Sequence, residues 1–317
     1  MIRLCFALCA IALSFSVHAQ AWPARAVKII APFAPGGSAD TLGRIVAKKL
    51  SEQLKESFVV ENRPGAGGVL GSELVSNAAP DGYTLVVSGI ASHVIAPQLP
   101  AGTPYDPMKD FTHIALLGGP PAVLAVKPSL PATNLKEFVE LAKQKPLSYG
   151  SPGNGTQGQL VAELFKHMAG IDLQHIPYKG ASAAVTDLMG GQIDSVSTTL
   201  STAAGQIKSG KARALAISGA RRLDEYPDVP TFAESGYPDL IATVWFSISG
   251  PKGLPDDIVQ KLNAEIRRAM ETSEVRDRLK NDGVTPNRLD AKQFTAFVAD
   301  EIHRWGPIVR KSGAKND

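Results

Sequence analysis

One pattern occurs twice in this chain and constrains its fold more than any other feature: an apolar strand, a turn rich in proline and glycine, and an amphipathic helix. In the first copy the strand spans residues 27–30, the turn spans residues 31–41, and apolar residues recur at helical spacing over residues 42–54. In the second copy residues 147–150 lead through a turn at residues 151–156 into a helix. Because ligands of α/β proteins bind at the carboxyl ends of strands, the pattern predicts two α/β units that each present a polar turn.

The chemistry of the first turn suits an anion. Its two prolines stiffen the chain, and Gly36 and Gly37 allow the backbone to approach a ligand closely. Ser38 or Asp40 is placed to cap the helix, whose first N–H groups form an anion site. Asp40 would repel an anion, so we expect it to cap the helix or to contact an amine or hydroxyl of the ligand. An ordinary strand-to-helix turn with a capped helix is the alternative for this stretch.

Residues 1–19 have the features of a cleaved secretory signal peptide: an early positive charge, an apolar run and a small residue, Ala19, at the expected cleavage point. The apolar run is too short for a membrane span. Both cysteines, Cys5 and Cys9, lie in this segment, and the bulky Leu8 argues against lipidation of Cys9. We therefore expect a periplasmic protein whose mature chain has no disulfide, thiolate metal site or cysteine nucleophile.

The mature chain is long enough for two domains. The full sequence of 317 residues carries 33 basic and 30 acidic side chains. This near balance argues against a nucleic-acid surface. Strand and helix patterns alternate along the chain, which predicts a largely parallel sheet covered by helices on both faces. The remaining expected strands are residues 56–60, 84–87, 111–117, 122–126, 173–178, 193–199, 212–217 and 245–249.

Patterns typical of catalytic sites fail when they are checked. Residues 65–70 lack the third glycine of a dinucleotide-binding fingerprint, and residues 36–40 lack the closing glycine of a nucleophile elbow. No histidines have the spacing of a zinc protease, so we expect no metal and no cofactor. His93 follows a strand in a small polar turn and is the histidine expected near a ligand, whereas His175 is expected to be structural.

Several motifs, in order along the chain, resemble the Bug-type substrate-binding proteins of tripartite tricarboxylate transporters, also called TctC-like proteins. They are PFAPGGSAD at residues 32–40, VENRPGAGG at 60–68, APDGYTL at 79–85, YKG at 178–180, KARALA at 211–216 and DVPT at 228–231. The resemblance implies a periplasmic binding-protein fold, with two α/β lobes, a ligand cleft and two interlobe crossings. It places the crossings near residues 117–119 and near Ile217.

The expected lobe one is therefore discontinuous, comprising residues 20–118 and 218–317, and lobe two comprises residues 119–217. The resemblance implies a monomeric receptor that captures a small organic anion, such as a carboxylate, and delivers it to the permease subunits of a tripartite tricarboxylate-type transporter. A periplasmic sensor that feeds a signalling partner is the main alternative. An exported α/β hydrolase is a weaker one, because the nucleophile elbow is missing.

The resemblance also maps the ligand loops onto residues 33–40 and 88–93 in lobe one, and onto residues 151–156 and 178–182 in lobe two. Main-chain N–H groups, hydroxyls and ordered waters are expected to hold one carboxylate, with little help from arginine. Residues 198–202 (TTLST) are rich in hydroxyls where relatives often carry proline or apolar residues, which leaves the ligand open. The residues expected to contact the ligand are Phe33, Pro35, Gly36, Gly37, Ser38, Asp40, Gly67, Ser88, Ser92, His93, Ser151, Gly155, Thr156, Tyr178 and Ser182.

Overall fold

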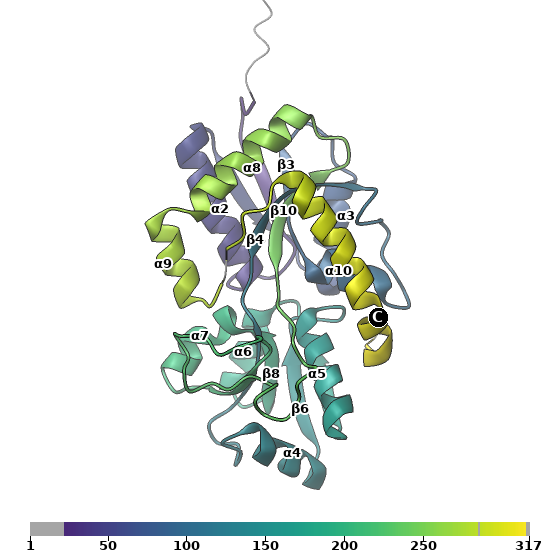
Figure 1. Ribbon diagram of the computed structural model, residues 1–317, viewed down its shortest axis with the longest axis vertical. Coiled ribbons are helices and arrows are strands. Elements are labelled where there is room, and N and C mark those ends of the chain that lie inside the picture. Colours follow the sequence, from purple (N-terminus) through teal and green to yellow (C-terminus); the bar gives the residue numbers. More distant parts are fainter. Residues whose placement is uncertain (1–21, 285, 315–317) are drawn as a thin grey trace, which may run out of the picture.

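The computed structural model describes residues 22–284 and 286–314, which form two α/β lobes placed one above the other (Figure 1). The predicted two-lobed periplasmic binding-protein fold is confirmed. The expected signal peptide, residues 1–19, lies outside the described residues. In the described part of the chain, no helix combines the length and the apolar character needed to cross a membrane.

The sheet of the first lobe is mixed. Its strands, from one edge to the other, are β2 (Phe58–Asn62), β1 (Val27–Ala31), β3 (Thr84–Gly89), β10 (Phe246–Pro251) and β4 (Phe111–Gly118). Strand β1 is parallel to β2 and β3, whereas β10 is antiparallel to both of its neighbours. The helices of this lobe are α2 (Ser38–Leu54), α3 (Val69–Ser76), α8 (Asp256–Met270), α9 (Ser273–Asn281) and α10 (Ala291–Ser312).

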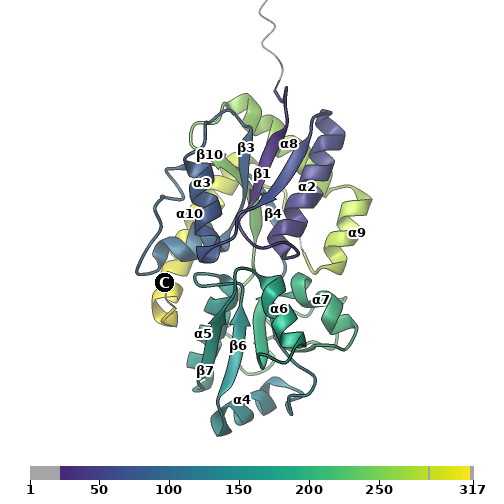
Figure 2. The same ribbon diagram turned by 180° about the vertical axis from the view of Figure 1, so that it is seen from behind.

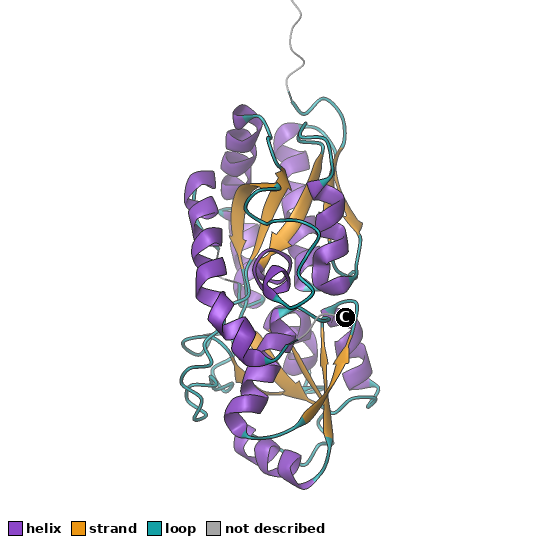
Figure 3. Ribbon diagram, turned by 90° about the vertical axis from the view of Figure 1, so that its right-hand side faces the viewer, coloured by secondary structure: helices purple, strands orange, loops and turns teal. Residues whose placement is uncertain are grey.

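The sheet of the second lobe repeats this arrangement (Figure 2). Its strands, in spatial order, are β7 (Leu173–Pro177), β6 (Leu147–Ser151), β8 (Ser195–Thr199), β5 (Ala122–Val126) and β9 (Arg213–Ile217). Strand β6 is parallel to β7 and β8, and β5 is antiparallel to both of its neighbours. The helices are α4 (Leu135–Gln144), α5 (Gln157–Ala169), α6 (Ala181–Met189) and α7 (Leu200–Lys208). Figure 3 shows helices on both faces of the sheets.

The expectation of largely parallel sheets is wrong for β5 and β10, and the reason lies in the connections between the lobes. Each of these strands is the first that the chain forms in its sheet after passing from the other lobe. Such a strand begins at the side of the sheet that faces the other lobe. Its neighbours end at that side, so the entering strand runs antiparallel to them.

The second passage between the lobes lies close to Val244, not near Ile217 as expected. After β9 the chain stays with lobe two: the Ile217 N–H donates to the Pro230 carbonyl (2.9 Å), and the ring of Phe232 lies 5.5 Å from that of Phe165 in α5. Only with β10 does the chain enter the sheet of lobe one. A strand that ends near the cleft therefore does not by itself mark a crossing, because a chain at that edge can also fold back onto the same lobe.

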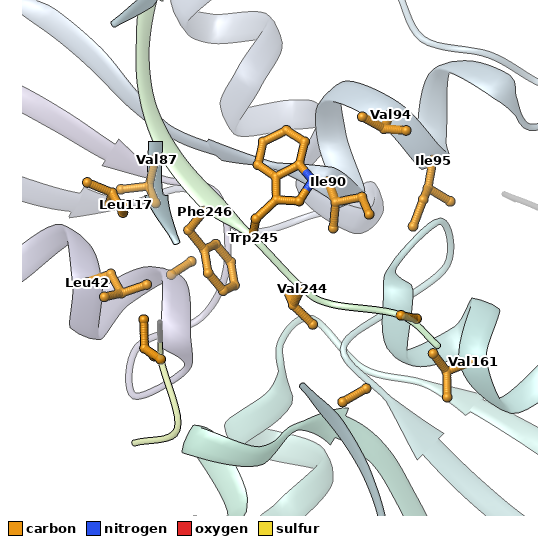
Figure 4. Close-up of a cluster of buried hydrophobic side chains, with 14 of the residues drawn as sticks. Leu42, Val87, Ile90, Val94, Ile95, Leu117, Val161, Val244, Trp245 and Phe246 are labelled. Atoms are coloured by element: carbon orange, nitrogen blue, oxygen red, sulfur yellow. The ribbon is translucent and has the colours of Figure 1, made fainter. Parts of the chain in front are cut away.

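Helix α10 connects the two lobes by packing against β4 of lobe one and α5 of lobe two. It begins with a capping box formed by Asp290 and Gln293. The buried Glu301 carboxylate in this helix accepts hydrogen bonds from the indole N–H groups of Trp245 (2.9 Å) and Trp305 (3.0 Å). Trp245 belongs to the passage beside the cleft (Figure 4). The Glu301 carboxylate therefore fixes the passage to the helix that spans both lobes.

Candidate ligand-binding site

A cavity of about 50 Å³ lies between the lobes. Residues from both lobes line it, since it is bordered by the first residues of α2 and α5, by the end of β3 and by residues 244–246 of the passage. Ala181, the first residue of α6, also lines it. The two polar turns recognised in the sequence are thus brought to opposite sides of one cavity.

The electrostatics of this cavity come from the backbone. No lysine, arginine, aspartate, glutamate or histidine is found among its described lining residues. The first turn of an α-helix, however, has N–H groups without intrahelical partners and carries a partial positive charge. Three such helix starts border the cavity, at Ser38, Gln157 and Ala181. The arrangement suits an anion without any cationic side chain.

Asp40 does not line the cavity, and its side chain stabilises the loop at residues 33–40 through hydrogen bonds within lobe one. Its buried carboxylate accepts hydrogen bonds from the Gly36 N–H (3.0 Å), from the Asn62 amide (2.9 Å) and from Arg44 Nε (3.1 Å). Burial by itself would raise the pKa of Asp40, but these hydrogen bonds and the Arg44 charge hold the pKa below its usual value. The expected ligand contact at Asp40 is corrected, because both of its oxygens are used within lobe one. The other expected role, capping of α2, is not seen either, because no side chain caps that helix.

Ser38 does not cap α2, as one of the two alternatives expected. Gly37 is the N-cap residue, and no side chain caps the helix. The Ser38 hydroxyl instead lies 2.6 Å from the Thr199 hydroxyl and 2.5 Å from the Ser201 hydroxyl, both in lobe two. The Thr202 hydroxyl lies 3.2 Å from the same Ser38 hydroxyl. Within the hydroxyl-rich stretch at residues 198–202, Thr199, Ser201 and Thr202 therefore form, with Ser38, an interlobe hydroxyl cluster at the border of the cavity.

In the second polar turn, Pro152 and Thr156 line the cavity. The Thr156 hydroxyl donates to the Gly153 carbonyl (2.6 Å) and accepts from the Gln159 N–H (3.4 Å), which caps α5. Ser151 is fully buried, with its hydroxyl 2.7 Å from His175 Nε2, so it positions the turn and does not face the cavity. Gly155 has φ +72° and donates its N–H to the Gln159 side chain (2.9 Å). The structure therefore places Ser151 and Gly155 behind the cavity wall.

The expectation that His93 contacts a ligand is wrong. Residues 91–95 form a π-helical turn that buries His93 completely, with its ring 4.4 Å from that of Phe111 and 5.8 Å from that of His113. Burial, together with the neighbouring His113, holds the pKa of His93 well below its usual value, so its ring is neutral. Ser88 and Ser92 do line the cavity.

The remaining predicted residues bring the lobes into contact around the cavity. The Ser182 hydroxyl donates to the Pro35 carbonyl (2.7 Å), and Gly36 lies beside Ser182. Phe33 lines both the cavity and an outer hollow of about 340 Å³, which Gly67 and Tyr178 also border. The two lobes are thus closed over the cavity, and the larger hollow lies next to the cavity on the other side of Phe33.

Sequence reasoning missed several cavity residues, above all Gln157, Thr199 and Phe246. Gln157 follows the cap residue Thr156 directly, so its position at the start of a helix beside a polar turn was the available signal. Trp245 is 4% exposed, packs edge-on against Phe297 and also lines the cavity, so it is a core residue that forms part of the cavity wall.

Comparison with known proteins gives consistent matches. The model of the tripartite tricarboxylate transporter family receptor (TctC) matches residues 42–314. Protein BugT of Bordetella pertussis is 37% identical over 302 residues, covering 94% of this chain and 93% of that protein. A solved R. palustris protein with adipate is 32% identical with a TM-score of 0.89, covering 93% of this chain and 99% of that one. MatC of Rhodopseudomonas palustris with bound malate is 33% identical with a TM-score of 0.86, covering 91% of this chain and 100% of that one.

Proposed function

The chain belongs to the family of tripartite tricarboxylate transporter receptors, and from this membership we propose that it captures a small carboxylate between its lobes and delivers it to a tripartite tricarboxylate-type membrane transporter. Receptors of this family are periplasmic binding proteins and not enzymes. The proposal concerns the ligand, the residues that hold it and the transport partner.

One observation carries the proposal: the starts of three helices meet at a cavity whose described lining has no charged side chain. A carboxylate there would accept hydrogen bonds from N–H groups near Gly37 and Ser38 in lobe one and near Thr156 in lobe two. Hydrogen bonds to an ionised group are short and strong, which offsets the lack of a cationic partner. The adipate and malate in two structural relatives support a carboxylate here as well.

The two sets of N–H groups belong to different lobes, so a small anion reaches both only when the lobes are together. A ligand shifts the balance between open and closed forms by its differential affinity for them. The two passages, at residues 118–122 and near Val244, are the connections about which the lobes would rotate. Capture of the ligand and closure of the receptor are then one event, and the closed form is what the membrane partner would recognise.

A thermal-shift screen of mono-, di- and tricarboxylates, aromatic acids and nicotinate-like compounds tests the proposal, with calorimetry for each compound that raises the melting temperature. Gly37→Val is the matched site variant. A Cβ at Gly37 would meet only the Ala34 carbonyl, at 3.8 Å, so the loop can keep its shape while the side chain fills the cavity. Gly205→Val, at a helical glycine with no neighbour within 4 Å, is the control.

We expect at least one carboxylate to bind the wild type and the Gly205→Val control, and to bind Gly37→Val at least tenfold more weakly. If no carboxylate in the screen binds, the proposed ligand class is wrong. If one binds all three proteins equally, the ligand site lies elsewhere.

A further inference from the structure

A chain of hydrogen bonds behind the second polar turn connects that turn to His175 in β7, the edge strand of the second sheet (Figure 2). The Gly155 N–H donates to the Gln159 amide oxygen (2.9 Å), and the Gln159 amide nitrogen lies 3.4 Å from His175 Nδ1. On the other side of the ring, His175 Nε2 lies 2.7 Å from the Ser151 hydroxyl. That hydroxyl donates to the Gly153 carbonyl and accepts from the Gly153 N–H, each at 3.2 Å. The imidazole ring thus supports the backbone of the turn at two places.

The donors and acceptors of this chain agree for only one arrangement of protons on the ring. The Gly155 N–H can only donate, so Gln159 turns its oxygen toward Gly155 and its NH₂ group toward His175. An NH₂ group can only donate, so Nδ1 of His175 carries no proton and accepts. The single proton of the neutral ring is then on Nε2, where it donates to the Ser151 hydroxyl. The network therefore requires a neutral His175.

A second proton on His175 breaks this pattern at Gln159. Both nitrogens of the charged ring are donors, so Nδ1–H would point at the NH₂ group of Gln159. Rotation of the Gln159 amide would relieve that contact, but it would turn the NH₂ group against the buried Gly155 N–H. Either response leaves a donor of the turn or of its support without an acceptor, which costs free energy. The turn is therefore held less firmly when His175 is charged.

The surroundings of His175 allow solvent to deliver that proton. The residue is partly exposed, whereas His93 and His113 are buried. Its ring stacks on Tyr149 of β6, with 4.7 Å between the ring centres and 18° between the ring planes. Burial, together with the nearby Glu163 charge, raises the pKa of Tyr149, so the hydroxyl of this neighbour stays neutral.

The charged groups around this ring pair are bound to one another. Glu163 in α5 accepts from the Tyr149 hydroxyl (2.5 Å) and pairs with Lys166 (3.1 Å). Lys166 also lies 3.5 Å from Asp172, in the turn before β7. Histidine is the side-chain type in this group that ordinarily changes charge between pH 5 and 8. His175 is therefore the residue through which pH in that range acts on the turn.

We propose that His175 is a positioning residue that makes carboxylate capture depend on pH, because only its neutral form completes the hydrogen bonds that hold the second polar turn. The inference rests on the proposed carboxylate site and adds its regulation. The effect reaches the cavity through Thr156, which lines it and donates its hydroxyl to the Gly153 carbonyl (2.6 Å). Every member of the chain belongs to lobe two, so the ring acts on the turn without a contribution from lobe one.

Calorimetry on the full mature protein at pH 8 and pH 6 tests the inference, with malate and adipate as probes because two structural relatives hold them. Carboxylates ordinarily stay ionised over this range. In the wild type we expect an affinity about twofold to fourfold lower at pH 6, the scale of one lost hydrogen bond in a protein that is only partly protonated.

His175→Gln keeps a donor for Ser151 and cannot titrate. Whatever its affinity at pH 8, we expect the ratio of its affinities at pH 8 and pH 6 to be close to one. His303→Gln is the matched control, because it removes an exposed histidine of α10, and it should keep the wild-type ratio.

Nuclear magnetic resonance of the ligand-free protein supplies a second measurement. In the wild type the backbone amide signals of Gly153 and Gly155 should shift with pH, with the same midpoint as the ring signals of His175. In His175→Gln these shifts should be absent. If that variant fails to fold, the agreement of midpoints in the wild type decides alone.

The outcomes separate the regulation from the carboxylate site itself. Equal wild-type affinities at both pH values, or a wild-type ratio in folded His175→Gln, overturn the role of His175 and leave the carboxylate site standing. Glycine signals that do not follow the ring of His175 overturn it as well. If the wider screen finds no carboxylate that binds, the proposed function fails, and the ligand-free titration still decides whether His175 controls the turn.

Discussion

Replacing Gly67 by alanine should separate closure of the lobes from their folding. Gly67 has φ +63°, and a Cβ there would lie 2.1 Å from the carbonyl oxygen of Asn154 in the other lobe. Real Cβ atoms essentially never approach another heavy atom closer than 3.0 Å, so the two backbones must move apart by roughly 1 Å. Neither partner is a flexible side chain, so the lobes as a whole must give way.

The cost follows from the interlobe hydrogen bonds that such a movement breaks. The Ala34 N–H donates to the Lys179 carbonyl (3.1 Å), the Ser182 hydroxyl donates to the Pro35 carbonyl (2.7 Å), and Ser38 contacts the hydroxyls of lobe two. At about 0.5–1.5 kcal/mol net for each of three bonds, closure loses about 1.5–4.5 kcal/mol. Affinity for a carboxylate should fall by about tenfold to a thousandfold.

Gly102→Ala is the control, because Gly102 has the same φ of +63° and a Cβ added there would have no heavy atom within 4 Å. Both variants carry the same backbone strain of about 1–2 kcal/mol, and only Gly67→Ala carries the interlobe clash. Calorimetry and small-angle scattering with the tightest-binding carboxylate of the screen compare them. Equal affinity and equal compaction of the two variants would refute a closure that depends on contact between these loops.

Three further outcomes are expected. Ser38→Ala removes the centre of the interlobe hydroxyl cluster and should weaken carboxylate binding by about 0.5–1.5 kcal/mol in calorimetry; an unchanged affinity would show that the cluster does not support closure. Asp40→Asn should lower the free energy of unfolding in urea by about 1.5–3 kcal/mol at pH 7, through loss of charge-assisted bonds. The pKa of Asp40 in the folded protein lies below the ordinary value of 3.8, so the ionised carboxylate stabilises the fold at pH values above 3.8. The difference in free energy of unfolding between the wild type and Asp40→Asn should therefore shrink as the pH falls below 3.8. An equal difference at pH 7 and pH 3 would contradict this. Mass spectrometry of the exported protein should find an N-terminus near Gln20, and an intact Met1 or a lipid on Cys9 would disprove the signal-peptide assignment.

Much of the secondary structure follows from the sequence, because local patterns determine it. The strand at Val27–Ala31 and the helix that follows the first turn lie where apolar periodicity predicted them. The same holds for β6 and α5 in the second unit. The helix beginning after Asn134 also follows from local chemistry, since the Asn134 side chain accepts from the Glu137 N–H (2.9 Å). Each of these features depends on residues a few positions apart.

The direction of β5 and β10, the position of the second passage and the burial of His93 depend instead on distant segments. His93 is buried by Phe111 and His113, which come from another strand of the folded sheet, so its small polar surroundings in the sequence were misleading. Chain reversal after Ile217 depends on packing of Phe232 against α5, which no local pattern encodes.

The same division applies to the candidate site. The two turns were recognisable because their prolines, glycines and hydroxyl residues have local conformational roles. Which of their side chains face the cavity depends on hydrogen-bond partners outside the turns. Asn62 and Arg44 donate to the Asp40 carboxylate, which keeps it within lobe one. The Ser38 hydroxyl bonds to the hydroxyls of Thr199 and Thr202 in lobe two. Sequence alone therefore located the turns that border the cavity. The packing of one lobe on the other decided that Gln157 lines it, because the cavity forms only where residues of both lobes come together.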